Sequence, residues 1–129
     1  MIDVSDLIGV KYTPHGRSKE EGFDCYGGAI EVLRRAGYEM RDFYYEQSIG
    51  NGTLYCSLLE GIPNIKLEKP EPYCIIGFVL RGKISHCGVY LGQNKFITAS
   101  LGVGVHVDSL LSWKKRVAGY YKVTNTNIR

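Results

Sequence analysis

The chain has 129 residues and a mass of 14.5 kDa, a length that suits one domain with one hydrophobic core over residues 1–129. Hydrophobic residues make up 44% and charged residues 22%, a balance that excludes a disordered or low-complexity protein. The net charge is +3, and the basic residues do not gather into a stripe, so we expect no nucleic-acid partner.

The beginning of the chain lacks the pattern of a secretion signal. Acidic Asp3 and Asp6 stand where a signal peptide carries Lys or Arg, and no apolar run approaches the ~20 residues of a membrane span. We therefore expect synthesis in the cytoplasm without a signal peptide, and no membrane span. A role at the cell wall or in a virion would then require delivery by other proteins.

The predicted elements begin with helices and end with strands. In chain order we expect a short helix at 3–9 capped by Asp3 or Ser5, a loop at 10–23, helices at 25–36, 39–48 and 53–60, and a loop-rich crossing at 61–72. Strands are expected at 73–80, 84–91, 95–101, 105–107 and 117–123, with a short helix capped by Asp108 and ending at Lys115 before the last strand. N-terminal helices packed on an antiparallel sheet are typical of an α+β fold.

The clearest element is the helix that follows Asp24. Asp24 is a good N-cap, small and apolar residues recur at helical spacing, and Gly37 suits the C-terminal end. Cys25 then lies in the first turn, where unpaired N–H groups and the helix dipole stabilise a thiolate. A small buried core residue is the commoner fate of a free cysteine, but this position favours a catalytic nucleophile.

The other three cysteines, Cys56, Cys74 and Cys87, are expected to be free thiols in the core. The sequence contains no CxxC pair, no metal-ligand cluster and no glycine-rich phosphate loop. We therefore predict no metal and no cofactor.

A cysteine nucleophile needs a base, and His86 is the best placed of three histidines because it begins a predicted apolar strand. Strand alternation puts His86, Gly88 and Tyr90 on one face, with Cys87 and Val89 on the other. Gly88 would leave room for a substrate or for the nucleophilic helix.

These residues resemble the NlpC family of cell-wall cysteine peptidases. Residues 22–27, Gly-Phe-Asp-Cys-Tyr-Gly, look like its G-x-D-C-x-G signature, and residues 86–92 are similar to its H-V-G-I-Y-L-G strand. Residues 9–12, 96–103 and 119–122 resemble its G-x-x-Y, F-x-H-A-S…G-V and G-Y-x-R segments. The order is right, with 86 − 25 = 61 residues between nucleophile and base. The loop at 14–18 and the small size look most like the phage-tail branch.

The resemblance implies a papain-like NlpC fold and a thiol mechanism. Cys25 attacks an amide carbonyl, His86 transfers the proton, and a third polar group orients the imidazole. The resemblance also implies an oxyanion or substrate-binding role for Tyr12 and Asp24, although Tyr12 could equally be a packing residue and Asp24 a helix cap.

The third position departs from the family pattern. The family places His, Asn or Gln twelve residues after the base, and 86 + 12 = 98 falls on Thr98. A threonine hydroxyl can accept a hydrogen bond from the imidazole but carries no charge. Ser100, on the same strand face, and His106 remain alternatives for this role.

The sequence thus predicts a cysteine peptidase or amidase that cuts an amide bond in peptidoglycan stem peptides, associated with a phage tail or injection machine. Two alternatives keep the fold. One is a catalytically weak tail-assembly or interaction module, and the other is an acyltransferase of the same superfamily.

Overall fold

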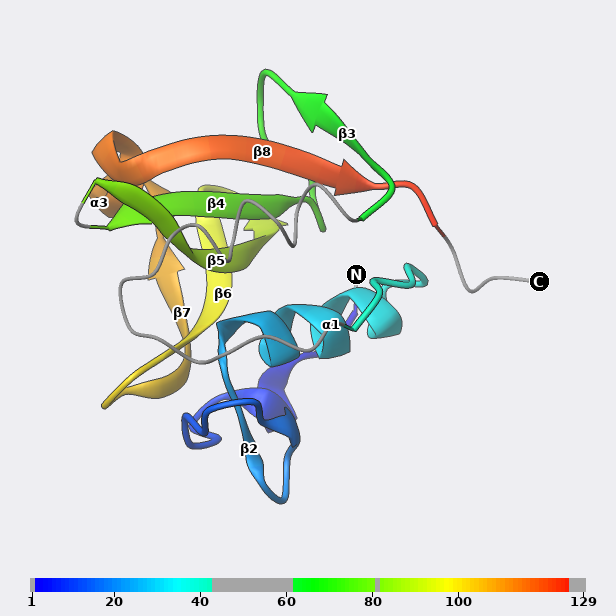
Figure 1. Cartoon of the computed structure of the whole chain (residues 1–129), viewed down its shortest axis with the longest axis vertical. Helices are drawn as coiled ribbons and strands as arrows, with labels where there is room; N and C mark the ends of the chain where they lie inside the picture. The colour runs from blue at the N-terminus through cyan, green and yellow to red at the C-terminus, as the bar shows by residue number, and fades with distance from the viewer. Residues whose placement is uncertain (1, 43–61, 81, 126–129) are drawn as a thin grey trace.

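The computed structural model describes residues 2–42, 62–80 and 82–125 (Figure 1). Its elements are η1 (Ser5–Leu7), β1 (Arg17–Ser18), β2 (Gly22–Phe23), α1 (Cys25–Arg35), β3 (Asn64–Leu67), β4 (Ile75–Leu80), β5 (Lys83–Gly92), β6 (Lys95–Ser100), β7 (Gly104–Ser109), α3 (Leu110–Trp113), η2 (Lys114–Arg116) and β8 (Val117–Val123). The predicted helix at 53–60 lies outside the described residues, as does most of the one at 39–48, whose described start at 39–42 is not helical.

Six strands form one antiparallel sheet in the order β3-β8-β4-β5-β6-β7, so the last strand inserts between β3 and β4. Helix α1 lies along one face of this sheet, with the β1–β2 hairpin beside its first turn (Figure 1). The predicted α+β fold, with helix packed on antiparallel sheet, is confirmed. This arrangement carries the start of α1 to the middle strands of the sheet.

Each face of the sheet has its own hydrophobic cluster. The cluster between α1 and the sheet includes Leu33, Cys87 and Val89, and the cluster on the other face includes Phe78 and Phe96. Alternation along β5 explains the division, because neighbouring residues of a strand point to opposite faces. The predicted placement of Cys87 and Val89 on one face and Tyr90 on the other is confirmed.

Helix α1 begins and ends as the sequence predicts. The carboxylate of Asp24 accepts a hydrogen bond from the N–H of Gly27 at 2.6 Å, which satisfies one of the unpaired donors of the first turn. At the other end Gly37 adopts φ +94°, and the N–H of Tyr38 donates to the carbonyl of Leu33 at 2.9 Å. These bonds form a glycine-terminated helix end.

The predicted helix at 3–9 is wrong. Only the single 3-10 turn η1 forms, and its N-cap is Val4, without a side-chain cap. Asp3 instead accepts hydrogen bonds from the N–H of Ser5 at 2.9 Å and from its hydroxyl at 2.7 Å, which closes a local turn before η1. Gly9, at φ +88°, follows directly and ends the segment.

Two segments expected to be loops contain short strands. The β1–β2 hairpin lies within 10–23, and β3 lies within 61–72, where it pairs with β8 at the edge of the sheet. Strands of two to four residues show no hydrophobic alternation of their own. These strands form because they pair with other segments of the chain, so the hydrophobic pattern of the sequence does not predict them.

The strands from β4 to β8 agree with the predicted ranges within two residues at each end, and β7 extends beyond the predicted 105–107 at both ends. The predicted helix cap at Asp108 is wrong, because α3 has Ser109 as its N-cap. Asp108 instead accepts hydrogen bonds from the N–H of Ser109 at 2.7 Å and the indole N–H of Trp113 at 2.8 Å. Asp108 therefore anchors Trp113.

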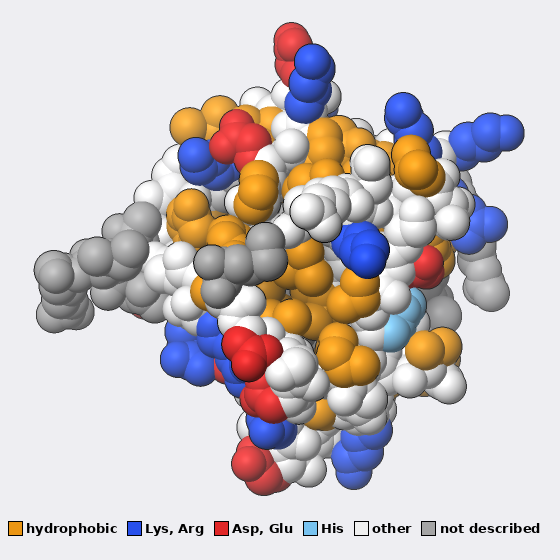
Figure 2. Space-filling model, turned by 180° about the vertical axis from the view of Figure 1, so that it is seen from behind, with side chains coloured by type: hydrophobic (Ala, Val, Ile, Leu, Met, Phe, Trp, Pro, Cys, Tyr) orange, Lys and Arg blue, Asp and Glu red, His pale blue; other side chains and the backbone are white. Residues whose placement is uncertain are grey.

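The distribution of charged side chains on the surface agrees with the modest net charge. On the face shown in Figure 2, Lys and Arg side chains are dispersed and do not line up in one stripe. Within the ranges that the structure describes, none of the helices has both the length and the apolar character needed to cross a bilayer.

Candidate active site

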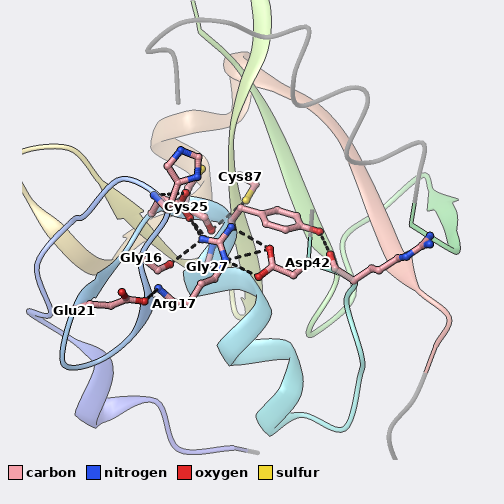
Figure 3. Close-up of polar contacts among 11 residues, drawn as sticks. Gly16, Arg17, Glu21, Cys25, Gly27, Asp42 and Cys87 are labelled. Atoms are coloured by element: carbon pink, nitrogen blue, oxygen red, sulfur yellow. Dashed lines mark hydrogen bonds and ion pairs between the residues drawn. The ribbon is translucent and has the colours of Figure 1, made fainter. Parts of the chain in front are cut away.

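Cys25 is the first residue of α1, and its side chain is partly exposed. Strand β5 lies against this end of the helix. The thiol of Cys87, which is fully buried, donates a hydrogen bond to the backbone carbonyl of Cys25 at 3.4 Å (Figure 3). The sulfur of the expected nucleophile therefore lies where the helix start meets the sheet.

A side chain of β6 contacts the backbone of β5 near this point. The backbone pairing of β5 with β6 runs from Gly92 opposite Lys95 to Val89 opposite Ile97. Beyond this pairing, the carbonyl of Cys87 accepts a hydrogen bond from the Thr98 side chain, Oγ1 to O, at 2.6 Å.

The same hydroxyl contacts the imidazole. Thr98 Oγ1 lies 2.9 Å from Nε2 of His86. A hydroxyl has one proton, and Thr98 gives it to the Cys87 carbonyl, which can only accept. The bond to His86 must therefore run from an N–H at Nε2 to the hydroxyl oxygen. In the neutral ring this leaves Nδ1 unprotonated and able to accept a proton.

Aromatic rings hold the His86 ring from the sides. His86 is 9% exposed and stacks on Trp113, with ring centroids 6.2 Å apart and planes 28° apart. The ring of Phe78 lies 5.8 Å away on the same side of the sheet. Together with the Thr98 hydrogen bond, these contacts restrict both the tilt and the rotation of the imidazole.

The electrostatic surroundings of Cys25 favour the thiolate. Hydrogen bonds from the Cys87 thiol and from the His86 imidazole hold the pKa of the Cys25 thiol well below its ordinary value. Burial and the negative charge of Asp24 act in the opposite direction and are outweighed. A thiolate at this position is the form that attacks carbonyl groups.

Asp24 is buried beside Cys25 and makes several structural contacts. Oδ1 accepts from the N–H of Gly27 at 2.6 Å and from the guanidinium of Arg17 at 2.9 Å, and Oδ2 accepts from the N–H of His15 at 3.2 Å. Asp24 thereby fastens the loop before β1 to the first turn of α1. Its expected part in substrate binding stays a prediction.

Arg17 completes this clamp. Its guanidinium bonds the carbonyl of Gly16 at 2.8 Å, forms paired hydrogen bonds with the carboxylate of Asp42 at 3.0–3.2 Å, and lies 5.7 Å from the ring centre of Tyr26 (Figure 3). One side chain thus joins the loop at 15–18, the nucleophilic helix and residue 42. No local pattern of the sequence predicts this role for Arg17, because only the folded chain brings these partners together.

The three candidates for the third position separate clearly. Thr98 contacts His86, whereas the hydroxyl of Ser100 lies 3.0 Å from Nε2 of His106.

Tyr12 is half-buried, packs against the core cluster and forms an isolated bridge with Phe23. Its proposed oxyanion contact stays a prediction.

The expectation for Gly88 needs correction. A Cβ at this position would lie 2.7 Å from the ring of Phe96 and 2.9 Å from the carbonyl of Ile97. The space that a side chain at residue 88 would occupy is therefore filled by the ring of Phe96, on the face away from α1. This leaves no opening there for a substrate or for the helix. Trp113, which supports His86, was not anticipated either, because it lies on a separate helix.

Among the residues described, no group of three or more His, Cys, Asp or Glu side chains is arranged to hold a metal ion.

Comparison with known proteins places this geometry in a family. Residues 9–122 match the model of the NlpC/P60 family. The murein DD-endopeptidase MepS/murein LD-carboxypeptidase of Escherichia coli K12 is 30% identical over 120 residues, which cover 90% of this chain and 57% of that protein. The gamma-DL-glutamyl hydrolase of Bacillus subtilis 168 is 28% identical over 130 residues, 98% of this chain and 29% of that protein. The chain thus spans between about a third and just over half of these relatives.

Solved structures agree on the fold. The NlpC/p60 domain of the peptidoglycan hydrolase SagA superposes with a TM-score of 0.59 at 21% identity, covering 92% of this chain and 89% of that one. An NlpC/P60 family protein from Bacillus cereus superposes with a TM-score of 0.62 at 19% identity, over 88% of this chain and 35% of the other. Since the family model spans nearly the whole described sheet and helix, the chain belongs to the NlpC/P60 family, as the sequence motifs predicted.

Proposed function

We propose that this chain is a cysteine peptidase or amidase that hydrolyses an amide bond of peptidoglycan stem peptides through a thioester. The observation that carries the proposal is the chain of contacts from Cys25 to His86 to Thr98, with Nδ1 of His86 left as the free base. Relatives named as an endopeptidase, a carboxypeptidase and a glutamyl hydrolase support the class of bond.

The reaction follows from the contacts. His86 takes the Cys25 proton at Nδ1, the thiolate attacks the amide carbonyl, and the backbone N–H of Cys25 in the first helical turn stabilises the oxyanion. The imidazolium then protonates the leaving amine. Thr98 still accepts from Nε2–H in the charged ring, so the imidazole keeps its orientation while a water molecule hydrolyses the thioester.

The test compares wild type with Cys25→Ala on purified muropeptides, with mass spectrometry of the products. We expect wild type to release fragments by cleavage of one amide bond and Cys25→Ala to release none. Cys74→Ala is the matched control, because Cys74 lies in the cluster on the other face of the sheet and its loss should leave cleavage intact. Cleavage by Cys25→Ala would refute the proposal.

A second candidate is a catalytically weak interaction module, and the neutral hydroxyl at Thr98 is the observation that favours it. The two differ in the reactivity of Cys25 with iodoacetamide across pH. An active site requires alkylation to persist well below pH ~8.5, the pKa of a free thiol, and requires His86→Ala to move the inflection upward. An inflection near the free value in wild type would favour the weak module. Association with a phage tail or injection machine stays a prediction from the sequence.

A further inference from the structure

Two thiols meet at the start of α1. Neither Cys25 in the helix nor Cys87 in strand β5, 62 residues apart, is part of a disulfide. The Cys87 sulfur lies 3.4 Å from the carbonyl oxygen of Cys25, and the same thiol is the largest cause of the lowered pKa of Cys25. Because standard bond lengths separate a carbonyl oxygen from its own Cα by under 3 Å, Cys87 Sγ lies within about 6 Å of the Cys25 Cα.

The two thiols differ in access. Cys25 is partly exposed, so a small dissolved oxidant can reach it, whereas Cys87 is 0% exposed and is shielded from such an oxidant. A reactive thiolate with a second thiol against it is the arrangement found in reversible redox sites, where the buried thiol resolves the oxidised one.

We propose that Cys25 and Cys87 form a reversible redox pair, in which a hydroperoxide oxidises Cys25 and Cys87 then closes an intramolecular disulfide. The proposal concerns the reactivity of the two thiols and does not depend on which amide bond the protein cuts. It adds a modification site at the nucleophile, with hydrogen peroxide as the simplest oxidant of the required class.

The chemistry balances in two steps. The Cys25 thiolate attacks one oxygen of hydrogen peroxide, an S–O bond forms, the O–O bond breaks, and the departing hydroxide is protonated to water. Cys25 is now a sulfenic acid, oxidised by two electrons. The Cys87 sulfur attacks the Cys25 sulfur, the S–S bond forms, the S–O bond breaks, and the hydroxide leaves as a second water with the Cys87 proton. A dithiol reverses the disulfide.

The disulfide has a protective consequence. Without a resolving thiol, further peroxide converts a sulfenic acid to sulfinic and sulfonic acids, which dithiols do not reduce. With Cys87 in place, oxidation stops at a form that a dithiol restores. Oxidation then blocks the Cys25 thiol reversibly, and a dithiol restores it.

The test uses the full chain, first reduced and then treated with a stoichiometric amount of hydrogen peroxide. Trypsin places the four cysteines in four different peptides, with Cys25 in 20–34 and Cys87 in 84–95. Non-reducing mass spectrometry should show these two peptides joined and lighter by two hydrogen atoms. Alkylation of Cys25 by iodoacetamide should be lost after peroxide and return after dithiothreitol.

Three variants sharpen the result. In Cys87→Val, and equally in Cys87→Ala should the first fold poorly, peroxide should drive Cys25 to the sulfinic acid, and dithiothreitol should no longer restore alkylation. In the matched control Cys74→Ala the joined peptides should form as in wild type, since burial raises the pKa of the Cys74 thiol to about 11 and keeps it unreactive. Cys56→Ser should likewise leave the crosslink unchanged.

Two outcomes would overturn the proposal. One is accumulation of sulfinic acid at Cys25 in wild type as fast as in Cys87→Val. The other is a crosslink from Cys25 to Cys56 or Cys74, or between two chains, in place of the 25–87 pair. The wild-type peptide map decides between these outcomes without any variant.

Discussion

A single hydroxyl makes two hydrogen bonds beside His86. Thr98 donates to the carbonyl of Cys87 and accepts from Nε2 of His86, so its one proton is committed to the backbone. A carboxylate or amide could not donate and accept through one atom in this way. The threonine therefore fixes the imidazole tautomer through the main chain of the neighbouring strand, without any charge.

Thr98→Val should expose this role. Valine keeps the volume but removes the acceptor for Nε2–H, so the tautomer with a proton on Nδ1, which cannot accept the thiol proton, gains population. We expect kcat/KM to fall by roughly 10–100-fold, about 1.4–2.7 kcal/mol, with the loss in kcat. Steady-state kinetics on a muropeptide measure this.

Thr98→Ser is the matched control, because it retains the hydroxyl and should stay within a few-fold of wild type. Equal activity of Thr98→Val and wild type would show that the hydroxyl does not orient His86.

At the scale of elements, the start of helix α1 depends on the loop that precedes it. The buried carboxylate of Asp24 raises the pKa of Cys25, and the guanidinium of Arg17 at 2.9 Å offsets that negative charge. Arg17 thereby couples the position of the loop before α1 to the pKa of the Cys25 thiol.

Arg17→Gln should leave Asp24 charged and short of a cation. We expect the inflection of Cys25 alkylation to move to higher pH and the free energy of unfolding to fall by about 1.5–3 kcal/mol. Iodoacetamide kinetics across pH and urea titration measure the two effects.

Adding Asp24→Asn tests the cause, because asparagine keeps the helix cap without the charge. The double variant should return the inflection toward that of wild type. Arg34→Gln, which removes a solvent-exposed guanidinium paired with Glu31 on the same helix, should leave it unchanged. Failure of Asp24→Asn to restore the inflection would contradict the electrostatic explanation.

Two adjacent glycines of α1 should respond in opposite directions to alanine. A Cβ on Gly27 would lie 2.0 Å from the carbonyl of Gly16, whereas a Cβ on Gly28 would make ordinary contacts of 3.9 Å with Ala99 and Phe23. We expect Gly28→Ala to stabilise the fold by roughly 0.5–1 kcal/mol through helix propensity, and Gly27→Ala to destabilise it by separating the loop from the helix. Urea titration of both variants checks this, and destabilisation by Gly28→Ala would contradict the packing described.

At the scale of the whole molecule, Arg35 ties the N-terminal segment to α1. Its guanidinium bonds both carboxylate oxygens of Asp6, at 2.5 and 2.9 Å, and Oε2 of Glu31 at 2.7 Å. The hydrogen bond from Arg35 lowers the pKa of Asp6 below its ordinary value. Burial acts to raise the pKa of Glu31, but hydrogen bonds from Arg34 and Arg35 outweigh it and lower that pKa as well.

A carboxylate whose pKa is depressed by folding stabilises the folded state above its unfolded pKa, and the stabilisation is lost as the pH falls through the folded pKa. The loss should therefore occur below about pH 4. Arg35→Gln should flatten the dependence of the urea midpoint on pH in this range. An unchanged acid dependence would show that these ion pairs do not contribute.

The parts of the fold that the sequence predicted carry local signals. Helix α1 has a cap at Asp24, helical periodicity and a glycine at its end, and the strands from β4 to β8 are apolar runs between turns. The short strands β1, β2 and β3 were missed because their hydrogen bonds depend on partners distant in the chain. Asp3 and Asp108 were misjudged as helix caps because an aspartate caps turns as readily as helices.

The candidate site divides in the same way. Cys25 and His86 stand in motifs, and Thr98 follows from spacing. Arg17 and Trp113 act through contacts that only the folded chain creates, so no local sequence pattern predicts their roles. The glycine at position 88 predicts a close contact, but the sequence does not identify the contacting group, which is the ring of Phe96.

The separation of nucleophile and base along the chain has a consequence for biosynthesis. Cys25 emerges from the ribosome 61 residues ahead of His86 and 73 ahead of Thr98, and the imidazole reaches the sulfur only after β5 and β6 have docked beneath α1. A nascent chain that ends before this docking has the thiol but no base to activate it. Under the proposed mechanism, Cys25 therefore stays inactive until β5 and β6 have been synthesised and have docked.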